Sequence, residues 1–274
     1  MLIHVFSLIY IFCTFLIDVI HHHPVAMPNK ILLHRYFPNT TLLVIALSQL
    51  LTLTVHAQKT DTSAYGVPVI RHFSQYEQGV SKDSLHRMVE LRTVVPGVVY
   101  DLRYATQNNF MNRRMYPKNT NISFLRLPAA LALQKILYEL NAKGYGMKIF
   151  DAYRPYSVTV SFWELVRDPR YVAEPTKGSG HNRGLALDCT IIRLSDGKEL
   201  DMGTGFDNFT DSAHHDFTQL PQQAIDNRKM FRALMEKYGF KAFETEWWHY
   251  SWPNNREYEV LDIPFEVLKR VRKQ

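Results

Sequence analysis

The sequence predicts an α+β fold with a central, mainly antiparallel sheet flanked by helices. Helical and strand-like segments are intermixed without a regular βαβ rhythm, which argues against a parallel sheet. Apolar residues recur at helical spacing in 128–144 and in 221–238, whereas 185–191 alternates as a half-buried strand does. These observations together favour helices packed against a sheet.

The predicted elements follow one another from residue 94 onward. Pro128 suits the first turn of a helix that Gly144 ends, and Gly239 ends the helix at 221–238. A further helix is expected at 157–166, and the tail at 264–274 is expected to be a basic helix or a frayed end. Strands are expected at Val98–Tyr104, at 147–155 (MKIFDAYRP) and at 240–252 (FKAFETEWWHYSW), with a loop at 108–121.

An apolar leader precedes this region. From Met27 the chain has the pattern of a secretory signal peptide, with a basic start, an apolar run at 41–55 and a small-x-small site, Val55-His56-Ala57, before Gln58. Residues 1–57 are therefore expected to be a leader that directs export to the periplasm. An uncleaved membrane anchor is the alternative. We expect an N-terminal arm at 58–93, with a short helix near 81–91, and the main domain at 94–274.

The composition is that of a folded domain. Hydrophobic residues make up 46% of the chain and aromatic residues 13%, which is enough for a packed core. The net charge of +6 is spread among acidic residues without a Lys/Arg run, so we expect a solvated surface and no nucleic-acid partner. Cys13 lies in the leader and Cys189 in the main domain, so no internal disulfide is predicted.

Two segments carry the residue types that bind a catalytic zinc ion. SGHNRGLALD at 179–188 offers His181 and Asp188, and EWWHY at 246–250 offers His249. Two imidazoles and one carboxylate are a typical set for zinc that keeps an open coordination position. Strand alternation after Gly184 places Asp188 on the opposite face from its apolar neighbours, where small residues leave room for an ion. One zinc ion per chain is predicted, with these three ligands.

Glu246 is the candidate general base of a zinc peptidase, because a glutamate near the last ligand takes a proton from water at the metal. Glu246 and His249 would face opposite sides of a regular strand, so this role requires an irregular backbone near Trp247. Otherwise both tryptophans are core residues and Glu246 is exposed. Glu244 is a rival base, five residues from His249 rather than three.

Other polar residues have two interpretations each. Arg154 suits either a developing oxyanion or a salt bridge with Asp151, and spacing alone does not separate the two. Asp207 in GTGFDNF could pair with a substrate's amino group, although an Asx-turn is the commoner role. His214 and His215 are adjacent, so we expect them near the ion without binding it, or at the surface.

The chain resembles the zinc D-alanyl-D-alanine dipeptidases of the vancomycin-resistance type, which share a fold with D,D-carboxypeptidases and the Hedgehog signalling domain. The resemblance implies that 94–274 is a zinc dipeptidase catalytic domain of this Hedgehog/D,D-peptidase-like fold. It is carried by YDLRYATQNNF (100–110), FDAYRP (150–155), SGHNRGLALD (179–188), MGTGFDNF (202–209) and EWWHY (246–250).

The resemblance also implies a reaction, the hydrolysis of D-Ala-D-Ala to two D-alanines. It makes Glu246 the general base, gives Arg154 the oxyanion role, and places Ser179 and Asp207 at the amino end of the dipeptide. Gln107 departs from an aromatic residue that is frequent in relatives, which bears on substrate preference.

Two rival functions remain. The first is a D,D- or L,D-carboxypeptidase or endopeptidase acting on peptidoglycan stem peptides, which the leader favours a little. The second is a non-catalytic zinc-fold binding module, which has no need of both Glu246 and Arg154. The expected partner is a small D-amino-acid dipeptide, with no stable membrane partner once the leader is removed.

Overall fold

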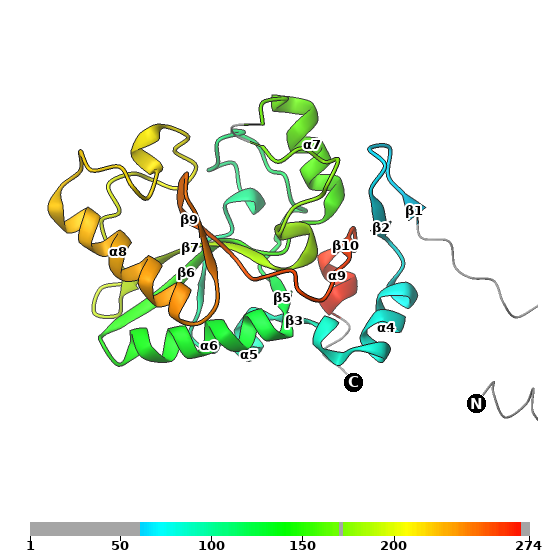
Figure 1. The fold of residues 1–274 in the computed structure, drawn as a ribbon, viewed down its shortest axis with the longest axis horizontal. Helices are drawn as coiled ribbons and strands as arrows, with labels where there is room; N and C mark the ends of the chain where they lie inside the picture. The colour runs from blue at the N-terminus through cyan, green and yellow to red at the C-terminus, as the bar shows by residue number, and fades with distance from the viewer. Residues whose placement is uncertain (1–60, 170–171, 270–274) are drawn as a thin grey trace, which may run out of the picture. The chain divides into compact units, whose positions relative to one another are not determined.

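The computed structural model describes residues 61–169 and 172–269, which fold around a five-stranded sheet (Figure 1). The predicted leader at 1–57 lies outside these residues. The strand order is β4-β6-β7-β9-β8; β4 and β6 are parallel, and the other neighbours are antiparallel. The predicted α+β class with a mainly antiparallel sheet is therefore confirmed. The strands are β4 (Val99–Tyr100), β6 (Tyr145–Asp151), β7 (Ala186–Arg193), β8 (Lys241–Phe243) and β9 (Glu246–Ser251).

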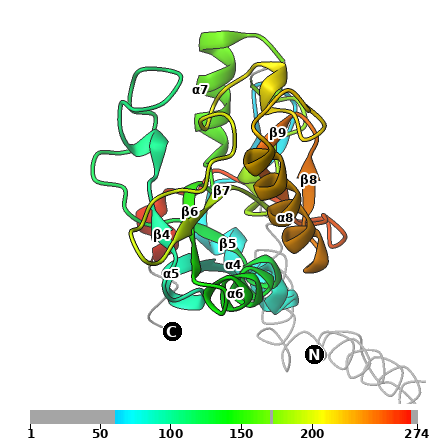
Figure 2. The same cartoon turned by 90° about the vertical axis from the view of Figure 1, so that its left-hand side faces the viewer.

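Two helices, α6 (Leu127–Asn141) and α8 (Gln222–Lys237), pack against one face of this sheet (Figure 2). Both match the predicted helices, and Pro128 lies in the first turn of α6. Leu187, Cys189 and Ile191 of β7 belong to the same buried cluster as these helices. The predicted alternation along β7 is confirmed, because Asp188 is left on the opposite face.

The opposite face of the sheet carries the polar side chains of β7. Helix α7 (Tyr156–Val166), which matches the helix predicted at 157–166, contributes Phe162 to a second buried cluster with Tyr104. None of the helices in residues 61–169 and 172–269 is long and apolar enough to cross a membrane.

The described part of the predicted N-terminal arm packs into the same compact unit as the rest of the domain. Strand β2 pairs with β1 on one side and, in parallel, with β10 near the C-terminus on the other. Strand β3 pairs with β5, antiparallel. These elements are β1 (Asp61–Thr62), β2 (Pro68–Ile70), β3 (Met88–Glu90), β5 (Phe124–Arg126) and β10 (Val260–Leu261), and the remaining helices are α4 (Phe73–Lys82), α5 (Leu91–Val94) and α9 (Phe265–Leu268).

Two local predictions were wrong. The helix expected near 81–91 lies earlier, at 73–82, because Asp83 ends it and accepts the backbone N–H of Leu85 in a new turn. The strand expected at 98–104 pairs only at Val99 and Tyr100. After Tyr100, the side chains of Thr106 and Asn109 donate to the Arg103 carbonyl, and such local hydrogen bonds compete with the pairing of a strand.

Candidate active site

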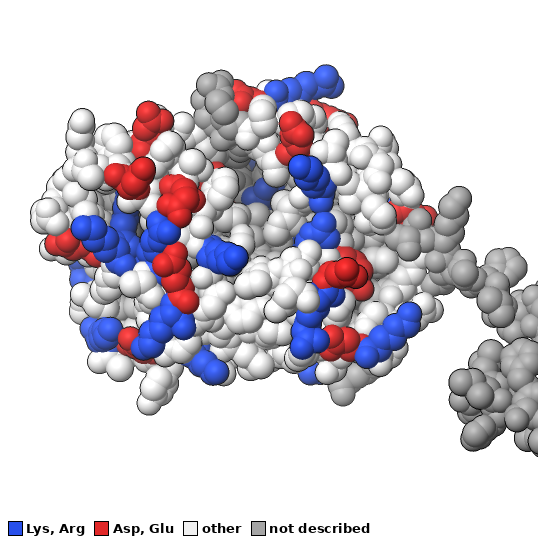
Figure 3. Space-filling model, in the orientation of Figure 1, with Lys and Arg blue, Asp and Glu red and all other residues white. Residues whose placement is uncertain are grey.

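Seven residues singled out from the sequence line one cleft of about 740 Å³. The space-filling view shows a hollow in this face of the molecule, with acidic and basic side chains interspersed around it (Figure 3). The seven residues come from four segments that are far apart in the sequence, so the fold assembles them. They are Arg154, Ser179, His181, Asp188, Asp207, Glu246 and His249.

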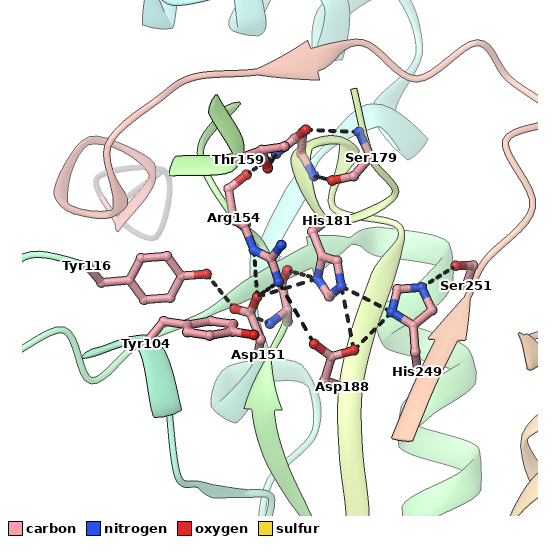
Figure 4. A network of polar contacts seen from close by, with 12 residues as sticks. Tyr104, Tyr116, Asp151, Arg154, Thr159, Ser179, His181, Asp188, His249 and Ser251 are labelled. Atoms are coloured by element: carbon pink, nitrogen blue, oxygen red, sulfur yellow. Dashed lines mark hydrogen bonds and ion pairs between the residues drawn. The ribbon is translucent and has the colours of Figure 1, made fainter. Parts of the chain in front are cut away.

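The three predicted metal ligands converge at the floor of this cleft (Figure 4). His181 lies in a 3₁₀ turn, 181–183, just before β7, and strand pairing places Asp188 directly opposite His249. His181 Nε2 lies 3.3 Å from His249 Nδ1 and 3.6 Å from Asp188 Oδ1, and His249 Nδ1 lies 3.0 Å from the same oxygen. Ligand atoms around a tetrahedral zinc ion are roughly 3.3 Å apart. The triangle therefore has the dimensions of a zinc site.

The second nitrogen of each imidazole has its own partner. His181 Nδ1 lies 2.7 Å from the Ala152 carbonyl and His249 Nε2 lies 3.1 Å from Ser251 Oγ. When these nitrogens carry the protons, His181 Nε2 and His249 Nδ1 keep bare lone pairs that point toward each other. Such pairs repel unless a cation lies between them, and ligand histidines are oriented in this way in metal sites.

Asp188 is the anionic member of this cluster. It is 3% exposed, and burial alone would raise its pKa, but the neighbouring His181 and His249 hold the pKa of this carboxyl below its usual range. A carboxylate that stays ionised is what a divalent cation requires. The charge, the chemistry and the geometry of these three residues therefore fit zinc.

Glycine shapes the turn that carries His181. Gly184 has a φ of +67°, which a residue with a side chain rarely adopts, and an added Cβ would lie 2.5 Å from the Met88 side chain. At Gly180 an added Cβ would lie 2.8 Å from the Cβ of Ala186. The two glycines let the chain turn tightly from the His181 segment into β7.

Glu246 reaches the site through the irregularity that its proposed role requires. Along β8 and β9 the pairing passes from Ala242–Tyr250 directly to Phe243–Glu246, so 247–249 form a bulge. Glu246 Oε2 lies 3.9 Å from His249 Nδ1. Burial raises the pKa of Glu246, whereas His249 opposes the shift. Trp247 and Trp248 are both buried, but the alternative of an exposed Glu246 is wrong, because its side chain is only 21% exposed.

Arg154 forms the predicted salt bridge with Asp151 and also lines the cleft. Its Nε and Nη2 donate to Asp151 Oδ2 at 3.0 and 2.7 Å, and Nη2 lies 4.0 Å from Asp188 Oδ2. Asp151 is fully buried and also accepts the Tyr116 hydroxyl at 2.5 Å. The salt bridge fixes the guanidinium at the cleft wall, and its Nη1 makes no hydrogen bond to the described residues.

Asp207 and Ser179 differ in how they are placed. Asp207 sits at a φ of +60° and accepts the Tyr104 hydroxyl at 3.0 Å, while burial, together with the charge of Asp188, raises its pKa well above the usual range. Ser179 exchanges two hydrogen bonds with Asn182 across the His181 turn. Asp207 is thus a half-buried carboxylate at a positive φ, whereas Ser179 also stabilises the turn.

Sequence reasoning missed several cleft residues. Tyr104 and Phe110 line the cleft. They follow the short strand β4, where the sequence has no strand or helix periodicity that would have marked them. His214 lines the cleft near Asp211, and His215 is partly buried away from it.

Comparisons with known proteins identify the family of this chain. A D-ala-D-ala dipeptidase family profile matches residues 84–267. A D-alanyl-D-alanine dipeptidase of Escherichia coli is 34% identical over 181 residues, which cover 66% of this chain and 92% of that protein. One from Enterococcus faecalis is 31% identical over 179 residues, covering 59% and 89%. A solved LD-carboxypeptidase, LdcB, is 20% identical with a TM-score of 0.35, covering 68% of this chain and 72% of that one. The chain therefore belongs to the D-Ala-D-Ala dipeptidase family, and so to the peptidases.

Proposed function

We propose that the protein is a zinc-dependent dipeptidase that hydrolyses D-Ala-D-Ala to two D-alanines. The observation that carries the proposal is the triangle of His181, Asp188 and His249, with Glu246 at its edge and Arg154 across from it. Family membership supports the substrate, because the relatives described above are D-alanyl-D-alanine dipeptidases.

Glu246 is the proton carrier of this reaction. When bound, zinc would supply a Lewis acid that polarises the peptide carbonyl and acidifies water. Glu246 takes the proton from the attacking water and then gives it to the departing D-alanine nitrogen. Burial raises its pKa above the usual carboxyl value, which suits a group that both accepts and releases a proton.

Arg154 stabilises the negative charge that develops on the carbonyl oxygen. The carboxylate of Asp151 fixes the guanidinium, so it is oriented before the substrate arrives. Donors that need no reorganisation are the most effective in stabilising a transition state. The network through Tyr116 extends this fixation into the core.

The amino group of the dipeptide pairs with Asp207. This carboxylate lines the cleft and is oriented by the Tyr104 hydroxyl. Near an ammonium group the ionised form of a buried carboxyl is favoured, so the pair forms even though burial raises the pKa of Asp207. Ser179 lies at the same cleft, where its hydroxyl can add a hydrogen bond.

The experiment that tests this function measures release of free D-alanine by the zinc-loaded chain from Gln58. The two substrates are D-Ala-D-Ala and an N-acylated peptide that ends in D-Ala-D-Ala. Cleavage of the free dipeptide alone supports the proposal. Efficient cleavage of the acylated peptide would instead make the protein a carboxypeptidase on stem peptides and leave Asp207 without its role.

We also propose that the protein is exported. The apolar run at 41–55 and the small-x-small site before Gln58 support a cleaved leader. Mass spectrometry of the protein recovered from the periplasmic fraction should find an N-terminus at Gln58. A chain that keeps residues 41–55 in the membrane fraction would favour the anchored alternative.

A further inference from the structure

Arg126 is a fully buried arginine beside the His181 turn. Its Nε donates to the Arg183 carbonyl at 2.8 Å, and its backbone N–H donates to the Gly184 carbonyl, also at 2.8 Å. One residue thus binds two consecutive carbonyls of the segment that leads from His181 into β7. These contacts fix where the turn ends.

The remaining donors of Arg126 fasten it to two other segments. Nη1 donates to the His86 carbonyl, and Nη2 donates to the Glu259 carbonyl at 3.1 Å and to its carboxylate at 3.2 Å. A buried guanidinium is stable only when its charge is paired and its donors are satisfied, and both conditions are met here. These hydrogen bonds therefore hold the planar guanidinium of Arg126 in one orientation.

We propose that Arg126 is a positioning residue of the metal site, which fixes the His181 turn in its ligand geometry before zinc binds. The proposal rests on the zinc site proposed above. The other end of the turn is fixed separately. The backbone N–H of Arg154 donates to the His181 carbonyl, and the Ala152 carbonyl accepts from the His181 ring. Arg126 supplies the anchor at the end that enters β7.

Arg228 offers a matched control within the same chain. It is 3% exposed and also donates to three backbone carbonyls, those of Met202, Ser212 and His214, at 2.6, 2.8 and 2.8 Å. These carbonyls belong to the loop that contains Asp207, and not to the segments of the metal ligands. A lysine at either position keeps the positive charge but loses the planar set of guanidinium donors.

The test compares Arg126→Lys with Arg228→Lys by zinc affinity, measured against a chromophoric chelator, and by thermal stability. Both variants should lose stability. Arg126→Lys should bind zinc about 10- to 100-fold more weakly, the range typical of residues that orient metal ligands, and Arg228→Lys should keep wild-type affinity. Equal affinities in the two variants, or wild-type affinity in Arg126→Lys, would overturn the proposal.

A second measurement needs no variant and covers the case in which Arg126→Lys does not fold. In zinc-free wild type, the amides of Gly184 and Leu185, which donate to the carbonyls of His181 and Gly180, should resist hydrogen exchange. If these amides exchange their hydrogens rapidly without zinc and become protected only when zinc is added, then zinc orders the turn and Arg126 does not. A wild type that binds zinc but releases no D-alanine would refute the proposed activity alone.

Discussion

The carboxylate of Glu246 and the ring of His249 lie on the same side of strand β9, with Oε2 3.9 Å from Nδ1, although they are three residues apart. A regular strand would direct them to opposite faces. The bulge at 247–249 removes this parity while both tryptophans stay buried. Local irregularity thus brings the Glu246 carboxylate to the edge of the cluster of His181, Asp188 and His249.

Substitution of Glu246 separates catalysis from metal binding. Glu246→Gln should retain zinc, because the three ligand atoms are untouched, but kcat should fall by about 10²- to 10⁴-fold with the loss of the proton carrier. Metal analysis and D-alanine release measure the two effects.

Glu244→Gln is the control for that variant. Glu244 is largely exposed and binds Arg232 through both oxygens, away from the cleft. Its loss should leave kcat near wild type. A large decrease in kcat for Glu244→Gln, together with a small decrease for Glu246→Gln, would mean that Glu244 is the general base.

Removing zinc should lower the stability of the protein. A ligand that binds only the folded state at 100 times its Kd stabilises it by about 2.7 kcal/mol. A chelator should therefore lower the Tm of wild type, and it should have little effect on His181→Ala, which has lost a ligand. An equal Tm shift in both proteins would contradict the ligand assignment.

The convergence of His181, Asp188 and His249 could be predicted from the sequence, but the contacts that hold the surrounding residues in place could not. His181, Asp188 and His249 were identifiable because their residue types and the glycines around them suit a metal, and alternation along β7 placed Asp188 correctly. The contact of Asp151 with Tyr116 depends on a loop without periodicity. The pairing of Arg126 with Glu259 joins segments 133 residues apart, and no local pattern encodes such a contact.

Replacement of Arg154 should affect the transition state more than substrate binding. Arg154→Lys keeps a positive charge but loses the bidentate contact with Asp151, so the cation is no longer oriented. We expect kcat to fall by about 10²- to 10³-fold, as when one oxyanion donor is lost, with a smaller change in KM. A rise in KM at constant kcat would show that Arg154 binds the ground state instead.

Asp207 should determine whether the protein requires a free amino terminus. Asp207→Asn removes the negative charge but keeps an acceptor for the Tyr104 hydroxyl, so the loop should keep its conformation. KM for D-Ala-D-Ala should rise by roughly 10-fold or more, because a charge-assisted hydrogen bond is lost. The low activity expected on N-acetyl-D-Ala-D-Ala should not change. If activity on both substrates fell equally, Asp207 would have a structural role alone.

His215 should make the stability of the protein sensitive to mild acid. Burial, with the nearby charge of Arg232, lowers the pKa of His215 to about 4, and its Nε2 has no partner among the described residues. The unfolded chain takes up this proton near its usual pKa of about 6.5, so the unfolded state binds more protons between about pH 6.5 and pH 4. Stability should therefore fall as the pH is lowered through that window, and not above it.

The variant His215→Gln should remove this contribution. The measurement is the free energy of unfolding, from chemical denaturation at pH 7.0 and pH 4.5. Between these two pH values, wild type should lose more of this free energy than His215→Gln does. The difference should be on the order of 2 kcal/mol after allowance for partial exposure. His214→Gln is the control, because the adjacent His214 lines the open cleft and its side chain is 34% exposed. An unchanged pH dependence in His215→Gln would mean that the folded protein accepts this proton, and hence that water reaches the ring.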